Sequence, residues 1–228
     1  GWPEDTALNG EIAELTARRW SFLLRCAGKM PATAAVHAQS DAGIGRVDGK
    51  PAMTSGRGAE AEAGCSPLLV ASEIFRTSRH VHGHPLAIPR VSLCVDLCRA
   101  LGWLPDDAYR ESGEARVDEL ARFHTREYIA AVQRAERHQQ LGDAERRRFN
   151  LGINGNPIYG EVFRRPATAC GASLLAARLI LKGGIVHNPA GGTHHGLPDR
   201  ASGYCVFNDP VLAILALLDG GLARVFYL

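Results

Sequence analysis

Apolar positions in the second part of the chain alternate between short unbroken runs and longer stripes at helical spacing. Residues 68–75 (LLVASEIF) form a short apolar run bounded by turn residues, which predicts a buried strand. Apolar residues then recur at helical spacing over 91–101, and Gly102 fits a left-handed helix stop. Residues 167–181 are rich in Ala and Leu and predict a long helix, after which residues 185–186 begin a short strand.

The remaining elements continue this order. Thr125 is the expected N-cap of a helix, and residues 118–124 before it are expected to be a short link. Asp209 is expected to cap a helix that begins at Pro210, and residues 224–228 are expected to form a further strand. Helices and strands in this order predict an α/β fold, in which helices cover both faces of a parallel sheet. Ligands of such folds gather at the carboxyl ends of the strands.

Residues 1–66 differ in composition and apolar pattern, and they are expected to lie outside the folded domain of residues 67–228. Residues 12–24 carry apolar positions that could form a short helix, whereas residues 28–66 are rich in Ala, Gly, Ser and Arg with little periodicity. Such a composition buries little surface and predicts loop or disorder. Two interpretations stay open: a genuine flexible extension, or upstream sequence translated in error with a true start near Leu68.

Composition narrows the classes of protein to consider. The chain has 228 residues, 46% of them hydrophobic, which is enough for a sizeable core. Its formal net charge is +2, so bulk charge gives no indication of nucleic-acid binding. The longest apolar runs fall short of the ~20 residues that span a bilayer, and the acidic start lacks the order of a secretory signal. A cytoplasmic location without nucleic-acid or membrane partners is therefore expected.

Two local clusters have ordinary structural interpretations. Cys94 and Cys98 are four residues apart on one helix face, with no second pair spaced to complete a zinc site, so core thiols are expected. The basic run of residues 146–148 is expected to be a solvated helix end or loop rather than an anion site.

Two adjacent histidines, His194 and His195, are the first candidates for chemistry. They follow a glycine pair in an irregular stretch just after the strand predicted at 185–186, and so at the carboxyl end of that strand. Neighbouring histidines on a loop cannot both hide in one apolar face. At least one of them must therefore find polar partners or meet a ligand.

The text around the pair, GGTHHGLPDRASGYCVFNDPVLAIL (191–215), resembles the signature of the zinc-dependent histone deacetylase family. That family also includes bacterial acetoin-utilisation proteins and acetylpolyamine amidohydrolases. The similarity continues upstream through HPLAIPR (84–90), FHTREYI (123–129) and GNPIYGEVF (155–163), and it covers roughly residues 68–228. The resemblance implies an arginase/deacetylase-like α/β fold. It also implies zinc-dependent hydrolysis of an acetyl-amide on lysine, a polyamine or another small amine.

The resemblance also implies roles for particular residues. His194 and His195 match the tandem histidines that act as general base and acid, moving the proton of a zinc-bound water to the leaving amine. Gly203 and Tyr204 match the glycine–aromatic pair that lines the narrow channel for the acyl-lysine stem. Arg90 matches an arginine near the inner end of the site, on the strength of a short motif only.

Two features depart from the family pattern. The family's zinc ligands lie in an Asp-x-Asp-x-His-His-Gly-Asp-Gly segment directly after a strand like residues 224–228, so none can be named here, and they are expected beyond Leu228. The chain is thus expected to be an N-terminal portion with an incomplete fold, inactive by itself. Gly155 stands where many relatives carry an acidic residue that holds the substrate backbone, which keeps small acetylated amines among the expected substrates.

Other interpretations remain. The chain could be a complete, non-catalytic binding or remnant protein that keeps an acyl-lysine-like channel without metal. A metal-free hydrolase with Cys205 as nucleophile is disfavoured, because nothing in the sequence supplies an oxyanion site or an activating geometry; packing is the expected role of this cysteine. His84 and His124 are expected to order loop backbone, residues 80–84 to be a surface loop rather than a metal tract, and His187 has no assigned role.

Overall fold

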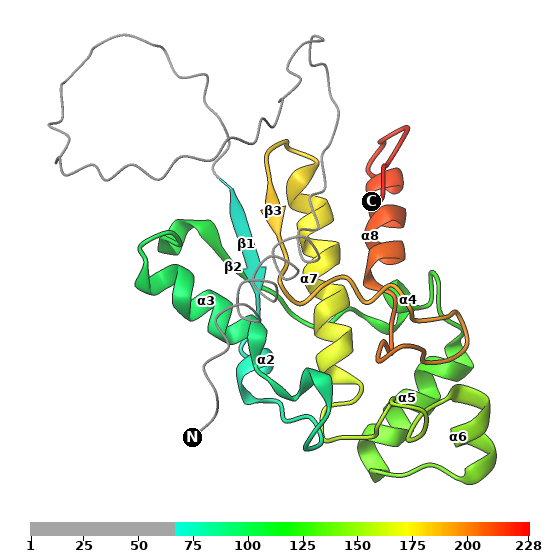
Figure 1. Ribbon diagram of the computed structural model, residues 1–228. Coiled ribbons are helices and arrows are strands. Elements are labelled where there is room, and N and C mark those ends of the chain that lie inside the picture. The colour runs from blue at the N-terminus through cyan, green and yellow to red at the C-terminus, as the bar shows by residue number, and fades with distance from the viewer. Residues whose placement is uncertain (1–66) are drawn as a thin grey trace, which may run out of the picture. The chain divides into compact units, whose positions relative to one another are not determined.

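A computed structural model describes residues 67–228, and the helix and loop expected within residues 1–66 lie outside this range. The centre of the described part is a parallel three-stranded sheet in the order β2-β1-β3 (Figure 1). Its strands are β1 (Leu68–Ala71), β2 (Tyr109–Glu111) and β3 (Val186–His187). The register pairs Leu69 with both Tyr109 and His187, so β1 is central in this sheet.

Helices surround this sheet. Two are single 3₁₀ turns, η1 (Pro85–Ala87) and η2 (Asp106–Ala108). The α-helices are α2 (Ile74–Thr77), α3 (Arg90–Ala100), α4 (Val117–Leu120), α5 (Arg126–His138), α6 (Asp143–Phe149), α7 (Arg164–Ile180) and α8 (Asp209–Asp219). No helix in residues 67–228 is both long and apolar enough to cross a membrane.

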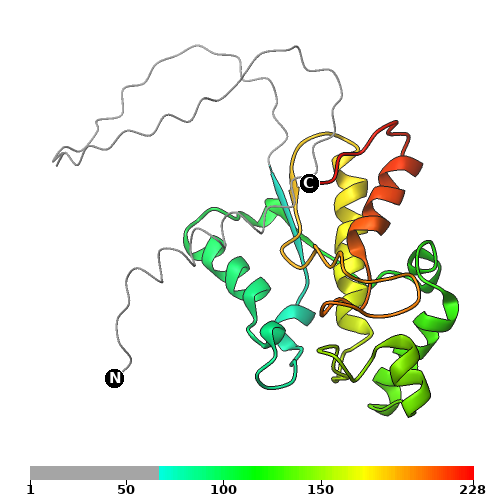
Figure 2. The ribbon, with the colours of Figure 1, turned by 45° about the vertical axis from the view of Figure 1, so that its right-hand side comes forward.

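Alternate residues of β1 face two different layers of helices. Val70 is fully buried in a cluster with residues of α7 and α8, whereas Leu69 and Ala71 pack in a cluster with Val95 of α3. This alternation follows from the two-residue period of a strand. Figure 2 shows the sheet between α3 on one side and α7 with α8 on the other. The predicted fold class, a parallel sheet covered by helices on both faces, is confirmed.

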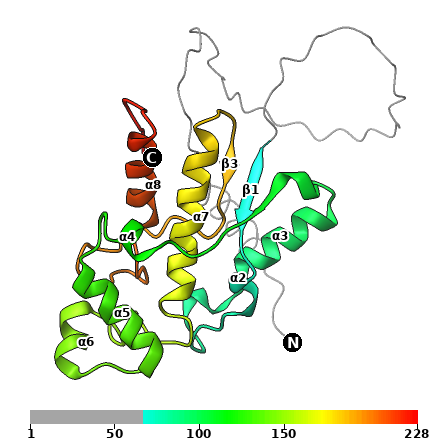
Figure 3. The ribbon, with the colours of Figure 1, turned by 180° about the vertical axis from the view of Figure 1, so that it is seen from behind.

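A third cluster lies where α4, α5 and α6 gather at one end of α7 and α8 (Figure 3). Tyr128 and Phe207 are its largest fully buried side chains. The Tyr128 hydroxyl donates to the carbonyl of Val206 at 2.8 Å, which ties α5 to the segment that precedes α8. This cluster therefore gives the loop before α8 a rigid base.

Several element boundaries differ from the sequence prediction. The run of residues 68–75 is a strand only to Ala71, after which the chain turns into α2. The first part of the link predicted over 118–124 belongs to α4. The second predicted strand lies one residue later, at Val186–His187. Thr125 is confirmed as the N-cap of α5, since its hydroxyl accepts from the Tyr128 amide at 3.3 Å.

The strand predicted over residues 224–228 is wrong. These residues have no regular secondary structure and pair with none of the strands in the described range. An apolar β-prone run becomes a strand only where a neighbouring strand offers backbone donors and acceptors. Val225 instead packs partly against the cluster of α7 and α8, and Phe226 is 71% exposed.

The predictions for the cysteine pair and for the basic run of residues 146–148 are confirmed in part. Cys94 and Cys98 lie on α3 and are half-buried, with Cys98 packed against the cluster around Val95, so they are only partly the buried thiols expected. The basic run ends α6, as predicted: Arg146 donates to the Gly152 carbonyl at 2.8 Å, and Arg148 pairs with Glu127.

Candidate functional site

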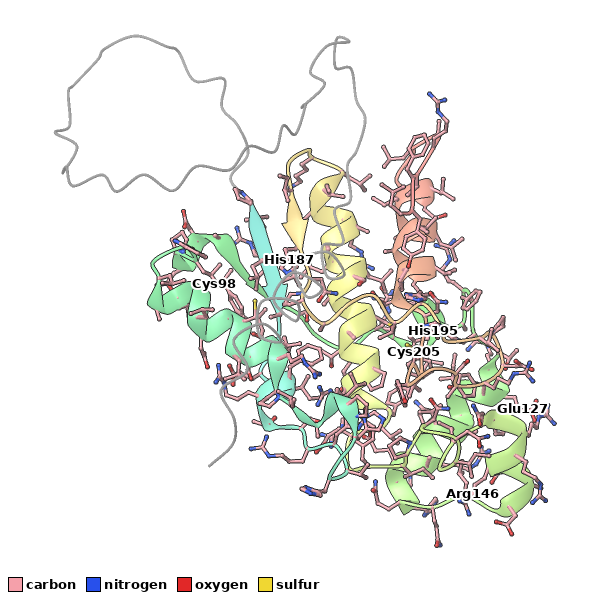
Figure 4. All side chains as sticks on the ribbon, viewed as in Figure 1. Cys98, Glu127, Arg146, His187, His195 and Cys205 are labelled. Atoms are coloured by element: carbon pink, nitrogen blue, oxygen red, sulfur yellow. The ribbon has the colours of Figure 1, made fainter. Side chains whose placement is uncertain are left out.

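The loop of residues 188–208 carries the histidine pair and begins at the carboxyl end of β3 (Figure 4). His194 and His195 are both exposed, and their ring centroids are 4.1 Å apart at an interplanar angle of 47°. The structure therefore brings both imidazoles to one accessible place on the protein. An imidazole accepts a proton when it is neutral and donates one when it is protonated, so two rings this close together can divide the roles of base and acid.

Asn208 fixes the backbone on both sides of His195. Its Nδ2 donates to the His194 carbonyl at 3.0 Å and to the Gly196 carbonyl at 2.9 Å, while its Oδ1 accepts from the Val211 amide at 3.2 Å. Asn208 is thus the N-cap of α8, and the prediction that Asp209 caps this helix is wrong. Asparagine serves here because its amide caps the helix with its oxygen and holds the loop with its nitrogen.

Asp209 is the first residue of α8 and is 1% exposed. Its carboxylate accepts from the amide of Thr193 at 2.7 Å, directly before the histidine pair. Burial raises the pKa of this carboxyl, whereas its hydrogen bonds oppose that rise. The sequence contained a signal for Asn208, since Asn before a Pro-bearing first turn is typical of an N-cap. No comparable signal indicated the loop contact of Asp209.

Gly203 lies directly against His195. A Cβ atom at this glycine would be 2.8 Å from Cγ of His195, and its φ of +53° is itself in the left-handed region. The following residue, Tyr204, also has a positive φ of 68°, and its amide donates to Oδ1 of Asn156 at 3.0 Å. The tight turn therefore places the Tyr204 backbone beside the pair, with Asn156 supporting the turn from another loop.

The exposed Tyr204 ring sits at the edge of a surface hollow of about 410 Å³. A Cβ atom at Gly155 would be 2.7 Å from Cε1 of this ring, and φ is +79° at this glycine. His84 meets the same ring edge-on at 5.0 Å, and its Nε2 lies 3.1 Å from the Gly155 carbonyl oxygen. A side chain at position 155 would thus displace the Tyr204 ring.

His84 and His124 order the backbone, as predicted. His84 accepts from the Leu86 amide at 3.1 Å and caps η1. His124 is 2% exposed; its Nδ1 is 3.0 Å from the Leu197 carbonyl, and its Nε2 accepts from the Asn208 amide at 2.9 Å. His124 therefore holds the histidine loop at two points of its backbone, Leu197 and Asn208.

Acid is expected to destabilise the fold through His124. Burial lowers the pKa of this imidazole to about 4. Below about pH 6.5 this histidine is protonated in the unfolded chain, whereas in the folded chain it takes up a proton only near pH 4. The free energy of unfolding therefore falls as the pH falls through this window. The loss reaches about 3 kcal/mol at its lower end. Urea unfolding between pH 7 and pH 4.5 measures the loss, and imidazole NMR identifies the group; a midpoint near 6.5 for folded His124 would contradict this assignment.

The remaining candidates lie near the loop without joining the pair. Cys205 is buried, its thiol is 3.5 Å from the Gly203 carbonyl, and burial raises its pKa, which suits packing rather than nucleophilic attack. Arg90 is exposed and donates to the Pro85 carbonyl at 2.6 Å, so its guanidinium is engaged by the turn that precedes α3. His187 is half-buried in β3, and burial lowers its pKa.

The described residues do not fit a resident metal ion. Across residues 67–228, no group of three or more His, Cys, Asp or Glu side chains could hold one. A catalytic zinc site in a protein ordinarily takes three protein ligands. Within this range, the two imidazoles of His194 and His195 therefore have no set of metal ligands beside them.

Comparisons with known proteins agree on one family. A family model of the histone deacetylase domain matches residues 84–228. Acetoin utilization protein AcuC of Bacillus subtilis is 31% identical over 163 residues, which cover 71% of this chain and 42% of that protein. Histone deacetylase 8 of Xenopus tropicalis is 33% identical over 132 residues, which cover 57% of this chain and 36% of that protein.

Solved structures give the same result. The crystal structure of an HDAC homolog from Aquifex aeolicus matches with a TM-score of 0.67 and 34% identity, covering 70% of this chain and 43% of that one. A structure of an HDAC homolog complexed with SAHA matches with the same values. The chain spans about two-fifths of the length of these relatives.

Proposed function

Because the chain belongs to the histone deacetylase family, we propose that the native protein hydrolyses the acetyl-amide of an acetylated lysine or of a smaller acetylated amine. The observation that carries this proposal is the exposed pair of imidazoles 4.1 Å apart, His194 and His195, on a loop at the carboxyl end of β3. This is the edge of a parallel sheet at which ligands gather.

The pair divides two proton transfers. One imidazole takes a proton from the water whose oxygen forms a bond to the acetyl carbonyl carbon. When the carbon–nitrogen bond breaks, the other imidazole gives a proton to the departing amine, which leaves acetate and a free amine. An imidazole suits both steps, because its ordinary pKa of about 6.5 lets it accept and release protons near neutral pH.

Gly203 and Tyr204 are proposed to form one wall of the substrate channel. The absence of a side chain at Gly203 lets the wall approach His195, since a Cβ atom there would be 2.8 Å from the imidazole. The aromatic ring of Tyr204 offers an apolar surface that suits the four-carbon stem of a lysine. The contact with Gly155 and the edge-on contact with His84 keep this ring in place.

Zinc is proposed as the cofactor of the native protein, on the strength of family membership. When bound, zinc supplies a polarised carbonyl and a more acidic water. Its ligands are proposed to lie outside residues 67–228, because the described residues do not supply a set of three.

The hollow beside Tyr204 is proposed as the outer end of the channel, and its lining is compatible with both substrate classes. The hollow beside Tyr204 is lined by residues 81–85, residues 152–157 and Tyr204 itself, and none of these is acidic. An acidic side chain at position 155 would meet the Tyr204 ring and a backbone with φ of +79°. A substrate backbone is therefore held here by amide and imidazole groups rather than by a carboxylate.

The proposal predicts acetate release by the intact native protein. Acetate production from an Nε-acetyl-lysine peptide and from N-acetylated diamines is measured side by side, together with the zinc content of the protein. Hydrolysis of at least one substrate class, abolished by a chelator and restored by zinc, is the expected result. Stoichiometric zinc without hydrolysis of either class contradicts the proposed reaction. If the protein contains no zinc and hydrolyses neither substrate class, the result favours the alternative of a non-catalytic binding protein.

A further inference from the structure

We propose that Asp209 is a positioning residue of the histidine pair: its buried carboxylate fixes the backbone just before His194 and thereby helps to orient both imidazoles. The role concerns the same loop as the proposed reaction, and its kinetic test rests on that reaction. Asp209 touches neither imidazole through any hydrogen bond in the described structure, so it acts through the loop and not on substrate.

One carboxylate oxygen binds Thr193, the residue directly before the pair. Oδ1 accepts from the Thr193 amide at 2.7 Å and from the Thr193 hydroxyl at 2.5 Å. The same hydroxyl lies 2.6 Å from the Phe207 carbonyl. Both the backbone and the side chain of Thr193 are thus fixed, and the peptide that leads into His194 has little freedom.

The other oxygen connects the loop to the helical layer. Oδ2 accepts from the Ser173 hydroxyl of α7 at 2.5 Å and from the Gly192 amide at 3.2 Å. Ser173 also accepts from Nδ2 of Asn188 at 2.9 Å, at the start of the loop. A single carboxylate therefore links α7, α8 and the backbone of the loop.

The loop backbone packs directly on this carboxylate. A Cβ atom at Gly191 would be 2.8 Å from Oδ2 of Asp209 and 3.0 Å from Nδ2 of Asn188, so only glycine fits between them. A buried carboxylate is tolerated only when donors replace its lost water, and here the loop provides most of those donors. The loop conformation and the buried charge therefore require each other.

The site needs an acceptor-only group. Four donors converge on Asp209, two from Thr193 and one each from Gly192 and Ser173. An asparagine of the same shape would place its own N–H groups against at least one of these donors. The neighbouring Asn208 donates to the carbonyls of His194 and Gly196. Asp209 therefore holds the backbone before the pair, and the N-cap Asn208 holds the backbone on both sides of His195.

The decisive comparison is Asp209→Asn in the intact native protein. We expect kcat on the acetylated substrate to fall about 10- to 100-fold, the size typical of a misplacement of about 1 Å, while KM changes little. The control is Asp219→Asn at the other end of α8, an exposed carboxylate paired with Arg122. It is expected to leave kcat unchanged.

A second pair of variants separates positioning from folding. Thr193→Ser keeps the hydroxyl donor and is expected to retain near-normal kcat. Thr193→Val keeps the shape but loses the donor, and is expected to lower kcat in a protein that still unfolds cooperatively. If Asp209→Asn does not fold, this pair alone decides: equal kcat in the serine and valine variants overturns the proposal.

An activity-independent measurement distinguishes this proposal from the proposed function. NMR of the His194 and His195 rings is expected to show shifted ring resonances in Asp209→Asn, and unchanged ones in Asp219→Asn. If the wild-type protein lacks deacetylase activity but the rings respond in this way, the proposed function fails and the positioning role stands. Unchanged rings in a folded Asp209→Asn protein overturn the positioning role.

Discussion

Replacing His195 by alanine in the intact native protein is expected to lower kcat by about 10²- to 10⁴-fold, the usual contribution of a positioned acid or base. His195 is exposed, lies 4.1 Å from the partner ring, and has Gly203 packed against it, so the substitution removes an accessible imidazole without emptying a core. The free energy of unfolding should therefore stay close to the wild-type value. Steady-state kinetics on the acetylated substrate, together with urea unfolding, measures both quantities.

The matched control is His138→Ala, an exposed histidine at the last position of α5. It is expected to retain wild-type kcat and KM. His194→Ala should also lose rate, and the pH dependence of the two variants assigns base and acid, because each should lose a different limb of the profile. Near-normal turnover by His195→Ala would remove this histidine from the reaction.

Replacing Gly171 by alanine is expected to lower the free energy of unfolding by about 3 kcal/mol or more. Gly171 lies inside α7 where the helix crosses residues 113–115, and a Cβ atom there would be 2.0 Å from the Gly113 carbonyl oxygen. The amide of Ala115 donates to the Ala167 carbonyl at 2.9 Å in the same contact, so the two backbones cannot separate without losing that bond. Urea unfolding of the variant beside wild type measures the loss.

Gly160→Ala is the control for this substitution. Its Cβ atom would have no neighbouring atom within 4 Å, so the unfolding free energy should change little. An unfolding free energy for Gly171→Ala equal to that of the control would show that α7 can move away from residues 113–115. The contact between α7 and residues 113–115 would then be looser than its hydrogen bond indicates.

Local sequence was enough to predict the parts of the site that depend on neighbours along the chain. The glycine pair, His194 and His195 lie in one short stretch, and the strand before them is apolar, so their place at a strand end follows from sequence order. The N-cap role of Thr125 is likewise local and is confirmed. Both predictions required only residues within one turn or one loop.

What the sequence could not predict depends on residues brought together by folding. Asp209 was expected to cap α8, but the next residue toward the loop, Asn208, caps it, which frees the carboxylate for Thr193 and Ser173. The strand expected at residues 224–228 failed for the same kind of reason. Its pattern is apolar, yet no strand in the described range pairs with it, and a pattern alone does not specify a partner.

The buried carboxylate of Asp209 also bears on how the loop opens. Loops that carry chemistry usually belong to the least stable parts of a protein and unfold locally at little cost. Here, opening residues 191–193 would withdraw three of the four donors from a carboxylate that is 1% exposed, leaving Ser173 as its one remaining donor among those described. Opening of this loop therefore costs more free energy than opening of a loop without such a carboxylate. Amide hydrogens at the start of the histidine loop should therefore exchange with solvent at rates close to those of the core, which is unusual for a loop that carries exposed histidines.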